Sequence, residues 1–212
     1  IYMSSSLEEE TLDIINELDL KTVLVETKDK EGRLPSVYID NIEATYEATK
    51  HLLDKGIKNI AFIGVDKSSA NAWGDRYIGY EKALNEAGIT VDEDLVYFEG
   101  LKVKSGYVAS EKFLASGKNF DGIICASDEI AMGAINGLRE KGVNTPEDVS
   151  VIGFNDNVVA SYFYPKLTTV KQPSYDMGSV AMRMLIKILN NKPLEKAEFI
   201  LKHELIERES CK

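Results

Sequence analysis

The sequence predicts an α/β fold built around a mostly parallel β-sheet with helices on both of its faces. Short apolar runs rich in β-branched residues recur along the chain, and helical apolar periodicity falls between several of them. The runs lack polar alternation, which is typical of strands covered on both sides. This strand–helix order favours parallel pairing through crossover helices. The predicted strands are residues 22–26, 36–40, 59–64, 95–100, 120–127 and 149–154.

Three helices are predicted by apolar side chains that recur on one helical face. Each is followed by a glycine, the residue most often found just after a helix C-terminus. These glycines are Gly56, Gly88 and Gly142. The predicted faces are Ile42, Tyr46, Thr49 and Leu53, then Tyr77, Tyr80, Leu84 and Ala87, then Ile130, Ala134 and Leu138.

Composition excludes several classes of protein. The 212 residues are 44% hydrophobic, which favours a sizeable core, and carry a formal charge of −10. A negative net charge argues against electrostatic binding of this chain to DNA or to an anionic membrane. No apolar run has the length of a membrane span. Two cysteines make no disulfide framework, which favours the cytoplasm. Because the chain opens at Ile1 with strand-like residues, we expect it to be a fragment.

Polar side chains follow most of the predicted strands directly. Since the carboxyl ends of parallel strands form the usual ligand-binding edge of such sheets, we expect these side chains to converge on a small polyhydroxylated or heterocyclic ligand. Carboxylates and amides would take hydroxyls, an arginine would donate in a fork, and a tryptophan would stack on a sugar face. The candidates are Asp40, Trp73, Arg76, Ser127, Asp128, Asn155 and Asp156.

Structural interpretations of the same residues stay open. Asp128 and Asn157 are also suitable helix caps. Arg76 is also compatible with a solvated helix position, and Trp73 with a lid over the core.

Signals for catalysis are absent from the sequence. His51 and His203 have no cysteine or carboxylate at metal-ligand spacing, and no nucleophile pairs with a base. We therefore expect a binding protein without a cofactor or metal. An enzyme is the alternative, with Asp128 and Asp156 as its best carboxylate pair.

Several stretches together resemble the LacI family of bacterial transcription regulators. They are RYIGYEKAL, ASDEIAMGAINGLREKG, NTPEDVSVIGFND, YPKLTTVKQP and DMGSVAMRML, in this order. The resemblance implies a type I periplasmic-binding-protein-like fold of two Rossmann-like subdomains with parallel sheets, of which the N-terminal one is incomplete here. It implies that residues 1–41 and 172–200 form the N-terminal subdomain, that residues 42–170 and 201–212 form the C-terminal subdomain, and that a DNA-binding helix-turn-helix lies upstream.

The family's effector site maps onto the strand ends described above. Its arginine matches Arg76, its acid at the subdomain crossing matches Asp40, and its polar pair matches Ser127 and Asp128. Asn155, with Asp156 next, stands where the family has an aspartate first. The resemblance implies a sugar, sugar phosphate or purine effector and a homodimer. A secreted sugar-binding protein of a transporter shares the fold and remains the alternative.

The segment VKQPSYDMGSVAMRML resembles the catabolite control protein A branch of Gram-positive bacteria. That branch uses a protein corepressor, the serine-phosphorylated phosphocarrier protein of sugar uptake. A plain surface helix is the alternative interpretation. Glu204 stands where the branch has a second arginine, which weakens the expected phosphate site. The residues that match the branch's corepressor contacts are Tyr175, Asp176, Val180, Arg183 and Met184.

Overall fold

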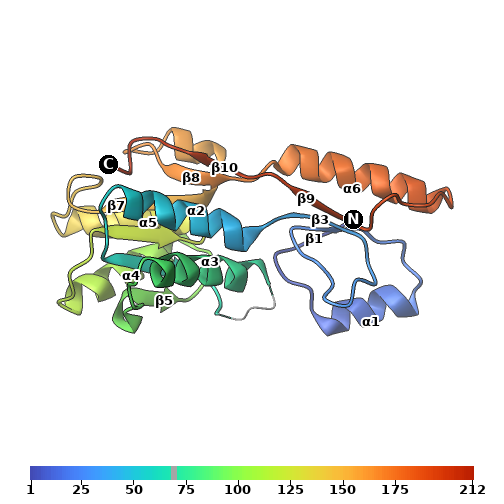
Figure 1. Cartoon of the computed structure of the whole chain (residues 1–212), viewed down its shortest axis with the longest axis horizontal. Coiled ribbons are helices and arrows are strands. Elements are labelled where there is room, and N and C mark those ends of the chain that lie inside the picture. Colours follow the sequence, from blue (N-terminus) through green and yellow to red (C-terminus); the bar gives the residue numbers. More distant parts are fainter. Residues whose placement is uncertain (68–70) are drawn as a thin grey trace. The chain divides into compact units, whose positions relative to one another are not determined.

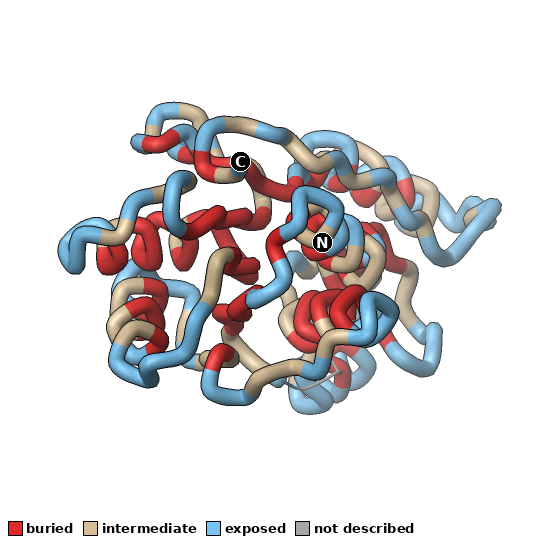
Figure 2. Tube along the Cα trace, turned by 60° about the vertical axis from the view of Figure 1, so that its left-hand side comes forward, coloured by how far each residue is buried: buried red, intermediate tan, exposed pale blue. Residues whose placement is uncertain are grey.

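The computed structural model describes residues 1–67 and 71–212 and divides the chain into two compact units, each with its own β-sheet (Figure 1). Among the described residues, unit 1 comprises Ile1–Asp40, residues 71–72 and Pro173–His203. Unit 2 comprises residues 41–67, 73–172 and Glu204–Lys212. In both units the buried residues gather in the strands and on the helix faces turned toward them (Figure 2).

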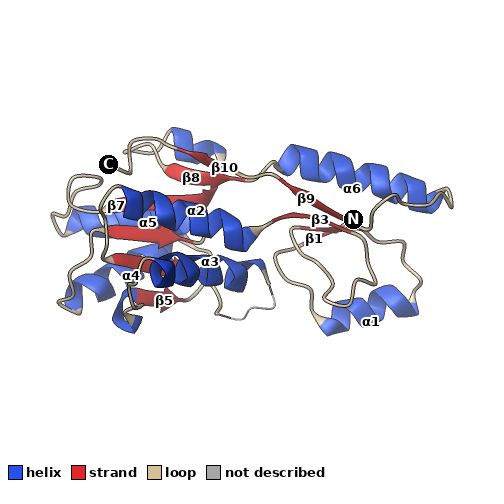
Figure 3. Ribbon diagram, in the orientation of Figure 1, coloured by secondary structure: helices blue, strands red, loops and turns tan. Residues whose placement is uncertain are grey.

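Unit 1 is built on a four-stranded parallel sheet in the order β1-β2-β3-β9. Helices α1 and α6 lie on either side of this sheet (Figure 3). Helix α6 buries Met177, Ala181 and Met184, and α1 buries Leu12 and Ile15. The elements are β1 (Tyr2–Met3), α1 (Glu9–Glu17), β2 (Leu24–Val25), β3 (Ser36–Ile39), α6 (Ser174–Leu189) and β9 (Glu198–Leu201).

Unit 2 is built on a six-stranded sheet in the order β10-β8-β7-β6-β4-β5. All neighbours are parallel except β10, which runs antiparallel to β8. The elements are α2 (Asn41–Asp54), β4 (Ile60–Gly64), α3 (Ala72–Glu86), η1 (Glu93–Leu95), β5 (Val96–Phe98), α4 (Val103–Ala115), β6 (Gly122–Cys125), α5 (Asp128–Glu140), β7 (Ser150–Asn155), η2 (Val158–Ser161), β8 (Thr168–Lys171) and β10 (Glu204–Ile206).

Two strand glycines show that helices cover both faces of this sheet. A side chain at Gly122 would meet Leu52 of α2, and one at Gly153 would meet Asp128 of α5. Gly122 pairs with Ser150, and Gly153 lies three residues further along β7. Because side chains alternate along a strand, the two glycines face opposite sides. The predicted parallel α/β architecture is therefore confirmed.

The three predicted helices are confirmed as α2, α3 and α5, together with their terminal glycines. Gly56, Gly88 and Gly142 have φ values of 83°, 72° and 79°, in the left-handed region that favours glycine.

The predicted face of α2 is confirmed only in part: Thr49 is buried, but Ile42, Tyr46 and Leu53 are half-buried. Its buried residues include Ala44, Ala48 and Leu52, whereas Tyr46 is half-exposed and donates a hydrogen bond to Glu86 Oε2 at 2.8 Å. Small side chains face inward because the helix packs closely on its surroundings. A Cβ at Gly79 of α3 would lie 2.2 Å from the backbone oxygen of Ile42.

No helix within residues 1–67 and 71–212 combines the length and the apolar character that crossing a bilayer requires.

Candidate ligand-binding edge of unit 2

Helix α3 is fixed to strand β4 by aromatic packing. The Phe62 ring lies 5.3 Å from Tyr77 and 5.1 Å from Tyr80, centre to centre. The Tyr80 hydroxyl donates a 2.7 Å hydrogen bond to the carbonyl of Ile60. These contacts hold the first turns of α3 at the carboxyl end of β4, where Arg76 projects from the helix.

Arg76 is enclosed at this end of the sheet, with only 2% of the residue exposed. Its Nε donates to Asn41 Oδ1 at 2.9 Å, and its Nη1 donates to the Ala126 carbonyl at 2.6 Å. Its guanidinium carbon lies 3.7 Å from the Phe154 ring centre and 4.6 Å from that of Trp73. The solvated-helix interpretation of Arg76 is therefore wrong. A guanidinium held between aromatic rings is a preoriented donor.

Trp73 is half-buried beside this guanidinium, one helical turn before Arg76 on α3. One part of its ring therefore packs on the protein, and another part remains accessible to a stacking partner.

Asp128 is fully buried in the first turn of α5. Its Oδ1 accepts from the Thr169 hydroxyl at 2.5 Å, and its Oδ2 accepts from the Asn157 backbone N–H at 2.7 Å. Burial raises the pKa of the Asp128 carboxyl to about 7, against the lowering effect of these two hydrogen bonds. The cap of α5 is Ser127, whose hydroxyl oxygen accepts from the Ile130 N–H at 3.3 Å.

The Asn155–Asp156 pair turns the chain sharply after β7. Both residues have positive φ, 111° and 56°, a region that asparagine and aspartate tolerate better than most other residues. Asn155 Oδ1 accepts from Gln172 Nε2 at 2.7 Å. Asp156 Oδ1 accepts from Arg208 Nη2 at 2.6 Å, and both side chains are less than one-fifth exposed. The turn is thus built from specific side-chain bonds.

Asn157 donates from Nδ2 to Glu129 Oε1 at 2.8 Å. It precedes η2 without capping it through its side chain, so the capping interpretation of Asn157 is wrong. With Asn155 and Asp156, it completes a run in which each polar side chain has its own partner.

Six of the seven predicted ligand-binding residues therefore lie at the carboxyl end of the unit 2 sheet. Contacts place four of them in two groups: Trp73 packs on Arg76, and Asp156 is linked to Asp128 through Thr169. Ser127 and Asn155 are next to Asp128 and Asp156 in the chain. The peptide chain joins the groups, because Ala126 is two residues before Asp128. Asp40 is the last residue of unit 1 and is bonded directly to Asn41, so their Cα atoms are about 3.8 Å apart.

Sequence reasoning missed several residues that position this edge. Thr169 and Gln172 come from β8 and its end, and Arg208 follows the antiparallel strand β10. Asn41, the first residue of α2, accepts from Arg76 Nε. The signal for Thr169 was its place in a β-branched run; no local pattern pointed to Arg208.

The residues expected to contact a protein corepressor lie on α6 in unit 1. Tyr175 is 87% exposed, Asp176 and Arg183 are exposed, and Val180 is half-buried, whereas Met184 is mostly buried. Within the described residues, Arg183 donates only inside its own helix, to the backbone oxygen and the hydroxyl of Ser179 at 3.3 and 3.4 Å.

A family model described as a periplasmic binding protein-like domain matches residues 49–211. The chain belongs to this family. The regulator RegA of Clostridium saccharobutylicum, named as an HTH-type transcriptional regulator, is 65% identical over 210 residues. That alignment covers 99% of this chain and 63% of RegA, so the chain spans less than two thirds of this curated relative.

Solved structures give the same assignment for this periplasmic-binding-protein-like chain. The transcription regulator CcpA of Lactococcus lactis is 38% identical with a TM-score of 0.90, covering 100% of this chain and 77% of CcpA. A complex of the regulator CelR with cellobiose is 30% identical with a TM-score of 0.91, covering 99% and 64%. Other neighbours are LacI-type regulators. The resemblance to LacI-type transcription regulators, and to catabolite control protein A among them, is confirmed.

Proposed function

We propose that this LacI-type domain binds a small-molecule effector at the carboxyl edge of the unit 2 sheet, and that Arg76 is the main donor to it. The observation that carries the proposal is the enclosure of the Arg76 guanidinium between Trp73 and Phe154. Burying the charged guanidinium of Arg76 has a desolvation cost. A role in binding a hydroxylated or anionic ligand explains why a charged group is buried at this edge of the sheet.

The proposed effector is a sugar, a sugar phosphate or a purine. The relative CelR was solved with cellobiose, which supports a carbohydrate. In this proposal Arg76 donates to the ligand, Trp73 stacks on its apolar face, and Asn155 donates to a ligand hydroxyl from Nδ2, because its Oδ1 already accepts from Gln172. Ser127, Asp128 and Asp156 already have partners in the protein, so their proposed contribution is to hold the edge in shape.

In the same proposal, effector binding changes how the two units are arranged and thereby changes operator affinity. DNA contact comes from an N-terminal domain of the whole regulator, which acts in the cytoplasm. The net charge of −10 supports this assignment, because a strongly acidic domain does not bind the DNA backbone through its overall charge. A secreted sugar-binding protein is less well supported, because the named relatives are transcription regulators.

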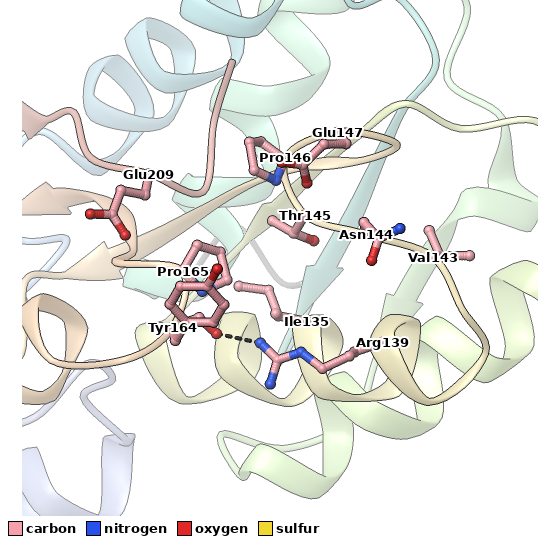
Figure 4. A pocket seen from close by; sticks show the side chains of 10 residues that line it. All are labelled: Ile135, Arg139, Val143, Asn144, Thr145, Pro146, Glu147, Tyr164, Pro165 and Glu209. Atoms are coloured by element: carbon pink, nitrogen blue, oxygen red, sulfur yellow. Dashed lines mark hydrogen bonds between the residues drawn. The ribbon is translucent and has the colours of Figure 1, made fainter.

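We also propose a homodimer, and assign its contact to an exposed apolar segment of unit 2. Val158, Tyr162 and Tyr164 are each about 80% exposed, which is unusual for neighbouring apolar side chains on a monomer. Arg139 of α5 donates to the Tyr164 carbonyl beside a cavity of about 820 Å³ (Figure 4). Light scattering of Tyr164→Glu tests this: a monomer is expected, and an unchanged dimer would contradict the assignment.

A protein corepressor is the second proposed ligand, and its site is α6 of unit 1. The exposed Tyr175, Asp176 and Arg183 and the half-buried Val180 support it, because together they offer an aromatic anchor, a charge of each sign and an apolar contact. Met184 lies beneath them as packing.

A thermal-shift screen of sugars, sugar phosphates and purines tests the effector proposal, because a ligand that binds only the folded state raises the melting temperature. At least one compound is expected to stabilise the wild-type chain and to leave Arg76→Lys unshifted. If every compound that shifts the wild type shifts Arg76→Lys equally, the proposal fails.

A further inference from the structure

Unit 1 contains a small cavity beside the proposed corepressor helix. It has a volume of about 260 Å³ and lies between α6 and the segment that leads into β9. Val180, Met184 and Phe199 form its apolar side. Because Val180 and Met184 are also residues of the proposed corepressor site, this cavity is continuous with that site.

The remaining walls of the cavity are strongly cationic for this protein. Arg183, Lys187 and Lys196 line it with a single carboxylate, Glu195, which leaves an excess of two positive charges. The whole chain carries −10. A local excess of the opposite sign at an apolar groove indicates a site for an anion.

The three cations differ in how far they are already engaged. Lys187 Nζ lies 3.0 Å from Glu195 Oε1, so this pair is neutral overall. Among the residues that the structure describes, Arg183 bonds only to Ser179. Lys196 has no hydrogen bond or ion pair with any residue within 1–67 or 71–212. Arg183 and Lys196 are therefore the two cations available to an external anion.

We propose that Lys196 is the second cation of a phosphoseryl-binding site whose first cation is Arg183. This inference rests on the proposed protein corepressor and names the residue that completes its phosphate site. A phosphoseryl group carries up to two negative charges and three strong acceptor oxygens, which two cations satisfy better than one. Lys196 thus replaces the arginine that the catabolite control branch has at the position of Glu204.

Glu204 is poorly suited to that role in this chain. It is an acid, it belongs to unit 2, and it pairs in register with Lys171 of β8. Lys196 belongs to unit 1, as Arg183 does, and lines the same cavity.

The occupant is assigned to a partner protein and not to a free phosphorylated metabolite. Tyr175 and Arg183 lie eight residues apart on α6, which corresponds to about 12 Å along the helix axis. A small anion would fill the cavity at Arg183 without reaching Tyr175. A protein surface that carries a phosphoserine and apolar neighbours covers both ends.

Titration calorimetry of the full chain with the serine-phosphorylated phosphocarrier protein tests the inference. Lys196→Ala is expected to weaken binding about 10-fold, the effect of losing one charge-assisted hydrogen bond, and to reduce the salt dependence of binding. Lys196→Arg should retain binding. The matched control is Lys192→Ala, a nearby exposed lysine that does not line the cavity, and it should leave affinity unchanged.

The outcomes separate the two proposals. If the wild-type chain binds phosphorylated carrier better than unphosphorylated carrier but Lys196→Ala binds as tightly as wild type, only the role of Lys196 is overturned. If the wild-type chain does not distinguish the two forms of carrier, the protein corepressor and the role of Lys196 both fall. Binding of serine phosphate with the same affinity as the phosphorylated carrier would contradict a protein occupant.

Discussion

The Arg76 guanidinium carbon lies 3.7 Å from the centre of the Phe154 ring, which joins the start of α3 to the end of β7. The same side chain bonds to Asn41 of α2 and to the carbonyl that follows β6. One buried arginine thus ties together four elements of unit 2 at the edge where ligands bind in sheets of this kind.

Replacing this arginine by lysine keeps the charge but removes the planar fork. Arg76→Lys is expected to lower the free energy of unfolding by about 1–3 kcal/mol, because buried hydrogen bonds and ring stacking are lost. Urea unfolding measures the change. Arg183→Lys is the control, since Arg183 is exposed and its bonds to Ser179 lie within α6, and it should leave the unfolding midpoint unchanged. Equal stability of Arg76→Lys and wild type would contradict the structural role of Arg76.

Because of Asp128, the free energy of unfolding of the protein should depend on pH. The folded-state Asp128 pKa of about 7 lies above the ordinary value of 3.8, so the folded protein binds more protons than the unfolded chain between those limits. The stability that Asp128 contributes therefore falls as pH rises from about 4 to about 7 and is constant above, with a slope of at most about 1.4 kcal/mol per pH unit.

Asp128→Asn removes this titration. Unfolding free energies of wild type and variant, measured at pH 5, 6, 7 and 8, should therefore diverge in favour of wild type as the pH falls. A difference that is independent of pH would show that Asp128 titrates normally in the folded protein.

The Asp156–Arg208 ion pair should contribute more to the free energy of unfolding than an exposed ion pair does. Its 2.6 Å bond is largely shielded from water, and it holds a turn with two residues of positive φ. A double-mutant cycle with Asp156→Asn and Arg208→Met is expected to give a coupling energy of about 1–3 kcal/mol. Additive effects of the two substitutions would indicate that the turn holds without this pair.

The contact between helices α4 and α5 should tolerate no side chain at Gly133. A Cβ at Gly133 would lie 1.8 Å from the Val103 backbone oxygen, so Gly133→Ala must separate the helices and is expected to cost more than about 2 kcal/mol. Gly178 of α6 has open space around it, and Gly178→Ala should stabilise the chain by about 0.5–1 kcal/mol through helix propensity. Thermal denaturation of both variants measures these changes in stability. If Gly133→Ala also stabilised the chain, the close packing of α4 on α5 would be contradicted.

The elements that the sequence predicted are those with bulky apolar patterns. Helix α4 was not predicted because, apart from Phe113, its buried residues are small: Ser105, Gly106, Ala109 and Ser110. Small residues are needed there because α5 packs so closely. The buried face of α2 was predicted only in part for the same reason: Thr49 is buried as expected, but alanines and not Tyr46 complete the buried face.

The sequence predicted which residues lie at the candidate site but not the hydrogen bonds and ion pairs that hold them. Strand ends identified Arg76, Asp128 and Asn155, because topology places consecutive carboxyl ends at one edge. The partner of Asp156 lies 52 residues away, after an antiparallel strand, and no local spacing predicts a contact of that range.

Trp73 is the only tryptophan of the chain, and its ring lies 4.6 Å from the Arg76 guanidinium, so its fluorescence reports directly on the proposed site. The most direct measurement is a fluorescence titration of the full chain with cellobiose and other sugars, sugar phosphates and purines. At least one compound should give a saturable change in Trp73 emission that Arg76→Lys abolishes. If compounds that stabilise the chain leave Trp73 emission unchanged, or change it equally in Arg76→Lys, the effector does not bind at this edge.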